Sequence, residues 1–131
     1  LIAWTSAASL RGGMDGPSGS YTGTATVLGQ SFVGKIVIES ESTADLYLSG
    51  EVSITCEDEP FHMDGKNLVL DDIDEKGDCL HDTLHKYKVK LVSSKYDPKE
   101  DQVTLEVKYA VIDIKIVCSK EEEALSVMMT S

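Results

Sequence analysis

The chain has 131 residues, 41% of them hydrophobic and 27% charged, a composition typical of one globular domain and not of a disordered chain. Its 12 basic and 23 acidic residues give a formal net charge of −11, which repels phosphate backbones and excludes nucleic acid as an expected partner. No window approaches the run of about 18 apolar residues that a transmembrane helix requires.

Composition also indicates how the chain is organised. Residues 10–20 are rich in glycine, serine and proline. We therefore predict a flexible leader at 1–20, a single β domain at 21–119 and a C-terminal tail at 120–131. Three cysteines are too few for a disulfide scaffold, and they leave secreted and cytoplasmic locations both open.

Alternating hydrophobicity predicts the first strands. Residues 21–27 alternate threonine with less polar residues, and residues 32–38 form a second, apolar segment after a short turn. Residues 43–56 then alternate without interruption, with Leu46 on the apolar face. We predict one long strand there, because the period of two persists well beyond a usual strand of about five or six residues. Gly50, in its middle, would let the strand bend.

Near the centre of the chain the spacing of apolar residues changes from that of a strand to that of a helix. Residues 61–70 contain an Asp-Gly turn between alternating segments, which predicts a hairpin. After a charged loop, Leu80 and Leu84 recur at helical spacing behind Asp78, a residue type that caps helix N-termini. These features predict one short helix at 78–87.

The last part of the domain predicts a second long hairpin. Residues 86–96 and 102–118 flank an Asp-Pro turn. In residues 102–118 the apolar positions are odd as far as Val111 and even from Ile112 onward. We therefore predict a β-bulge near 110–112, which would bring both runs to one face of a single strand.

Together these elements predict a mainly β fold, an antiparallel meander that forms a barrel or half-barrel with one short helix near 78–87. The chain length, the strand order and the early sequence GSYTG at residues 19–23 loosely resemble the calycin and streptavidin-like barrels. The Gly-x-Trp signature of lipocalins is absent from the sequence. The resemblance therefore implies a barrel architecture and no particular family.

Cysteine and histidine residues give the candidate metal and disulfide sites. His81 and His85 lie one helical turn apart and, with Cys79, are the candidate metal ligands. We expect solvated histidines and no metal, because Cys79 points away from His85 on a helical wheel and no second cluster follows. Of the three cysteine pairings we favour Cys56 with Cys79, a loop whose closure would stabilise the fold by about 3 kcal/mol.

The sequence offers no catalytic motif. It holds neither Gly-x-Ser-x-Gly nor a glycine-rich phosphate loop before a helix, so we predict no enzyme activity and no cofactor. The leading hypothesis is a non-catalytic binding protein that holds a small apolar ligand inside the barrel. The candidate lining residues are Gly34, Leu46, Leu48, Gly50, Val107 and Tyr109.

The alternative hypothesis is a protein-interaction module, such as a secreted inhibitor or an adhesion-type domain. Its acidic loops or a sheet edge would then contact a protein partner. Residues 21–27 or 102–118 would be the edges that support a homodimer.

Overall fold

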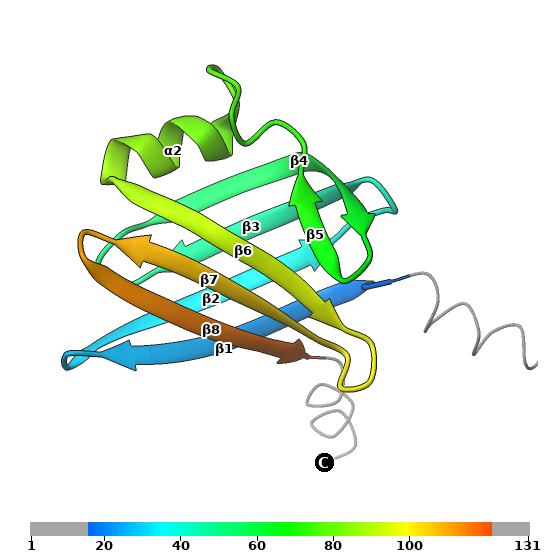
Figure 1. The fold of residues 1–131 in the computed structure, drawn as a ribbon, viewed down its shortest axis with the longest axis horizontal. Coiled ribbons are helices and arrows are strands. Elements are labelled where there is room, and N and C mark those ends of the chain that lie inside the picture. The colour runs from blue at the N-terminus through cyan, green and yellow to red at the C-terminus, as the bar shows by residue number, and fades with distance from the viewer. Residues whose placement is uncertain (1–15, 122–131) are drawn as a thin grey trace, which may run out of the picture.

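The structure is a computed structural model that describes residues 16–121. It is a closed barrel of eight antiparallel strands, with a short helix between the fifth and sixth strands (Figure 1). The elements are β1 (Gly19–Val27), β2 (Gln30–Ile38), β3 (Thr43–Ser49), β4 (Ile54–Asp64), β5 (Asn67–Leu70), α2 (Cys79–Tyr87), β6 (Val89–Asp97), β7 (Gln102–Tyr109) and β8 (Ile112–Lys120). The predicted antiparallel barrel with one short helix is confirmed.

The predicted leader at 1–20 and tail at 120–131 fall largely outside the described residues. Within residues 16–121, no helix has the length and apolar character of a membrane span.

The barrel is a simple meander in which each strand pairs with the next and β8 pairs with β1. Alternate side chains of all eight strands point inward and form one apolar core. This follows from the period-two pattern, because a closed sheet has one inner face that must exclude water and one outer face that meets it.

The prediction of one long strand at 43–56 was wrong. The structure divides this segment into β3 and β4, with Leu48 paired to Ile54 across a turn. Gly50 lies exposed in that turn with a φ of +134°. A Cβ atom on Gly50 would come within 2.5 Å of the Ser31 carbonyl oxygen, so the turn can lie this close to β2 only without a side chain.

The predicted bulge near 110–112 was also wrong, because the chain makes a hairpin turn there. β7 ends at Tyr109, β8 begins at Ile112, and these two residues pair directly. Ala110 takes a positive φ of 59°, and Val111 at the tip is 88% exposed. The shift from odd to even apolar positions is therefore a reversal of chain direction and not an extra residue within a strand.

Closure of the barrel also removes the edges that were expected to support a homodimer. β1, which contains residues 21–27, lies between β2 and β8. The segment 102–118 forms β7 and β8, each of which also has two neighbours. Neither segment is therefore an open edge of the sheet, although the ladder between β1 and β8 consists of only the pairs Tyr21–Lys120 and Thr22–Ser119.

Closure depends on a close approach between β1 and β8. Gly23 in β1 faces the backbone of β8, where an added Cβ would lie 2.1 Å from the carbonyl oxygen of Val117. Its partner in β2 is Gly34, whose Cβ would meet only side chains, with the nearest atoms of Ile116 at 3.3 Å. The two paired glycines thus have different roles: Gly23 admits a backbone, whereas Gly34 leaves room for a flexible side chain.

We expect Gly23→Ala to lower the free energy of unfolding by about 2 kcal/mol or more, because β8 must move and the closing ladder is distorted. Gly34→Ala is the matched control and should cost less than about 1 kcal/mol, since Ile116 can shift. Urea denaturation of the two variants measures this difference. Equal losses would show that the β1–β8 contact does not limit closure.

The barrel end opposite α2 is closed by a polar cluster. The hydroxyl groups of Tyr21 and Tyr96 both donate to Asp101 Oδ1, at 2.7 and 2.9 Å. Lys120 Nζ lies 3.4 Å from Asp101 Oδ2 and 5.0 Å from the centroid of the Tyr21 ring. Burial and the hydrogen bonds to Asp101 raise the pKa of both phenols, that of Tyr96 to about 12, so both remain donors. The cluster ties β1, β6 and β8 to the β6–β7 turn.

The same cluster should make stability depend on acidity. Burial raises the pKa of Asp101, but the two tyrosine hydrogen bonds and the Lys120 charge outweigh burial and leave the pKa below its ordinary value. Ionised Asp101 therefore stabilises the fold above its unfolded-state pKa of about 3.9, and this contribution is lost as the pH falls through the lower folded-state value. Asp101→Asn should cost roughly 1 kcal/mol at neutral pH, because the carboxylate is partly exposed.

Chemical denaturation between pH 7 and pH 2 tests this expectation. The stability difference between the parent and Asp101→Asn should shrink as the pH falls below about 4. Asp113→Asn, at an exposed position of β8, is the control, and its stability should depend on pH as that of the parent protein does. A constant difference between the parent and Asp101→Asn would contradict the assignment.

Candidate functional site

An apolar cavity of about 40 Å³ lies inside the barrel at the end that α2 covers. Leu80 and Leu84 of α2 line it on one side, and residues of β3, β4, β6, β7 and β8 line the rest. Its lining consists of Leu46, Tyr47, Leu48, Ile54, Leu80, Leu84, Leu91, Leu105, Val107 and Ile116. Such a wall excludes water and offers dispersion contacts, and it holds no charged side chain.

The structure brings three of the six predicted lining residues together at this cavity, namely Leu46, Leu48 and Val107. The other three lie elsewhere. Gly34 is buried behind the side chain of Ile116, and Tyr109 is half-buried at the edge of the core. Gly50 lies exposed in the β3–β4 turn, which corrects the expectation that it faces the interior.

Helix α2 supplies the part of the wall that the sequence analysis did not assign. Leu80 and Leu84 are its buried residues and both line the cavity. Their spacing predicted the helix, and that same spacing was the available signal for a shared buried face. Asp78 caps the helix by accepting hydrogen bonds from the backbone N–H groups of Leu80 and His81, at 3.1 and 3.2 Å. The cap fixes where the first turn begins.

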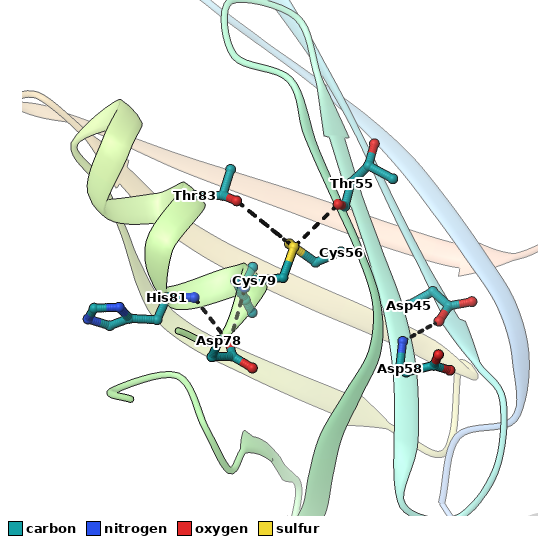
Figure 2. The surroundings of a disulfide bond; sticks show 9 residues. Asp45, Thr55, Cys56, Asp58, Asp78, Cys79, His81 and Thr83 are labelled. Carbon is teal, nitrogen blue, oxygen red and sulfur yellow. Dashed lines mark hydrogen bonds between the residues drawn. A yellow bond between two sulfur atoms is a disulfide. The ribbon is translucent and has the colours of Figure 1, made fainter. Parts of the chain in front are cut away.

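A disulfide between Cys56 in β4 and Cys79 at the start of α2 fastens the helix to the barrel wall (Figure 2). This is the pairing favoured from the sequence. The bond closes a loop with a sequence separation of 23, worth about 3 kcal/mol in the chain-entropy model. Thr83 Oγ1 lies 3.8 Å from Cys56 Sγ, and the Thr55 carbonyl oxygen lies 3.4 Å from Cys79 Sγ.

The third cysteine, Cys118, is free and buried in β8. Burial raises the pKa of its thiol to about 11, so the thiolate form is disfavoured. This cysteine is therefore a small apolar core residue and not a reactive thiol.

A buried carboxylate adjoins the disulfide. Glu59 is only 2% exposed, and its Oε1 atom has no hydrogen-bond partner. A β-bulge places it there: Asp58 takes a positive φ of 57° and its N–H donates to Asp45 Oδ1 at 2.8 Å, which shifts the register of β4 against β3. Burial, aided by the neighbouring Asp78, raises the pKa of Glu59 to about 7.

The sequence analysis missed Glu59 because the surrounding acidic segment resembles a solvated turn. The pattern of apolar residues in this segment nevertheless indicated that Glu59 faces inward. The inward residues of β4 are even-numbered at Ile54 and Cys56 but odd-numbered at Phe61. A strand can change parity in this way only through an extra residue, and the inward set then includes position 59.

The candidate metal ligands His81 and His85 do not gather with Cys79 around one point. The two imidazole rings stack with centroids 6.1 Å apart, and His81 Nδ1 lies 3.0 Å from Asp82 Oδ1. Figure 2 shows the His81 ring directed away from the disulfide that holds Cys79. No group of three potential ligands that includes either histidine occurs in the described part of the chain.

No family model, curated protein or solved structure matches the chain. The site therefore consists of a small aliphatic cavity, a helix that forms one of its walls, and a disulfide that holds this helix in place. An aliphatic wall can bind an apolar group by excluding water, but it offers no acid, base or nucleophile to a reaction.

Proposed function

We propose that this protein is a non-catalytic binding protein that holds a small, uncharged apolar group in the cavity under α2. The observation that carries the proposal is the cavity lining, which is aliphatic apart from Tyr47. A site with this lining favours hydrocarbon over any polar ligand, because a polar group would lose its hydrogen bonds to water without replacement.

The volume of the cavity limits the ligand class. At about 40 Å³ the cavity is much smaller than an engineered apolar cavity of about 150 Å³ that binds benzene. Pockets for drug-sized ligands typically span about 300–1,000 Å³. The ligand is therefore a short alkyl group, and anything longer requires α2 to move outward with Leu80 and Leu84.

The probe for this site is xenon, a single apolar atom of suitable size, monitored through the methyl NMR signals of the leucines. Titration should produce saturable shifts at Leu46, Leu48 and Leu84, which line the cavity. Leu48→Phe fills the cavity and should weaken xenon binding by about tenfold or more, at a cost of about 1–3 kcal/mol in stability.

Val33→Phe provides the matched control, because Val33 lies on the neighbouring strand but faces outward and is 42% exposed. This variant should bind xenon as the parent does. Shifts that map outside the cavity, or equal binding by both phenylalanine variants, would contradict the proposed site.

A second candidate function, protein interaction through the acidic loop before α2, has its own support. Asp72, Asp74 and Glu75 lie in this loop and take part in none of the ion pairs among the described residues. Unneutralised acidic groups on one loop attract a basic partner.

The test of this second candidate is binding of an oligolysine peptide at low ionic strength. The double variant Asp74→Asn, Glu75→Gln should bind less tightly than the control double variant Glu41→Gln, Glu51→Gln, which removes the same charge from other exposed turns. Binding should weaken as salt is added. If both double variants lose the same affinity, net charge alone is responsible and the loop is not a docking site.

A further inference from the structure

We propose that reduction of the disulfide converts Cys56, Cys79 and Glu59 into a site for a zinc-like divalent cation. The two sulfur atoms and one carboxylate oxygen of Glu59 all lie within 4.8 Å of one another. Ligand atoms around a tetrahedral zinc ion are about 3.5–3.8 Å apart, given bonds of about 2.3 Å to sulfur and about 2.1 Å to oxygen. Small adjustments of the three side chains would therefore suffice. This inference does not rest on the proposed function.

The strongest indication of a ligand is the unpartnered carboxylate oxygen. Glu59 is 2% exposed and its Oε1 has no hydrogen-bond partner, a costly arrangement in a protein interior. The bulge at Asp58 directs Glu59 inward, beside the sulfur atoms. A cation bound by both thiolates would lie within reach of this carboxyl group.

The surroundings suit a metal that enters from the surface. Cys79 is exposed, whereas Cys56 is fully buried, so solvent reaches the site from the helix side. Thr83 Oγ1 lies 3.8 Å from Cys56 Sγ and 4.0 Å from Cys79 Sγ, from where its hydroxyl can donate to a thiolate (Figure 2). Three protein ligands leave the fourth tetrahedral position to water.

The chemistry of the donors selects the cation. Two thiolates and one carboxylate favour zinc or cobalt over calcium or magnesium, which require oxygen ligands only. The disulfide form cannot bind in this way, because its sulfur atoms carry no negative charge.

The conversion has two balanced steps. A phosphine reductant cleaves the S–S bond, takes the oxygen of one water molecule to become a phosphine oxide, and leaves a hydrogen atom on each sulfur. The cation then replaces the two thiol protons, which are released to the buffer, and the carboxylate of Glu59 completes the protein ligands. The site is thus available in the reduced protein and absent from the oxidised protein.

The test uses the full chain reduced with a phosphine. Zinc should bind one to one with release of at least two protons, and should raise the unfolding midpoint of the reduced protein. Cobalt, added in place of zinc, should give the charge-transfer absorption of thiolate ligation. The oxidised protein should show neither effect, which provides a control of identical sequence.

Two glutamine substitutions separate the role of Glu59 from a general charge effect. Glu59→Gln should weaken zinc binding by about tenfold or more, whereas Glu57→Gln, at an exposed position of the same strand, should leave it unchanged. Both variants keep the disulfide, so their oxidised forms report whether each folds. Equal zinc affinity of the two variants, binding by the oxidised protein, or a cobalt complex without thiolate absorption would overturn the proposal.

Discussion

The constraint on which the structure depends is closure of the sheet between β1 and β8. The two strands can meet only because Gly23 has no side chain where the Val117 carbonyl oxygen approaches. Once the ring is closed, every strand has two neighbours and the inward side chains must share one small interior. This interior includes a cavity of about 40 Å³, and the closed sheet has no open edge strand.

Closure gives the barrel two chemically different ends. At one end the hydroxyl groups of Tyr21 and Tyr96 donate to the shared carboxylate of Asp101. The other end is covered by α2, which contributes aliphatic side chains and is tied to β4 by the Cys56–Cys79 bond. The polar end therefore contributes to the stability of the barrel, whereas the apolar end contains the cavity, the helix that lines it and the disulfide.

The errors in strand assignment have a common physical origin. Two residues that pair across a hairpin point to the same face of the sheet. When their residue numbers differ by an even number, as those of Leu48 and Ile54 do, the apolar residues keep the same parity on both sides of the turn. When the difference is odd, as between Tyr109 and Ile112, parity changes just as it does at a bulge. Hydrophobic alternation therefore cannot distinguish a long strand from a hairpin, although the unusual length of both segments was a warning.

The sequence by itself determined the core face of segments such as β3 and β7, where the helix begins, and that the fold is an antiparallel meander, because periodicity and capping are local properties. Only the tertiary structure decided that the meander closes, that Gly50 lies in a surface turn, and that Glu59 is buried beside the sulfur atoms. These outcomes depend on contacts between residues distant in the chain, such as that of Gly23 with Val117, and a local pattern carries no information about them.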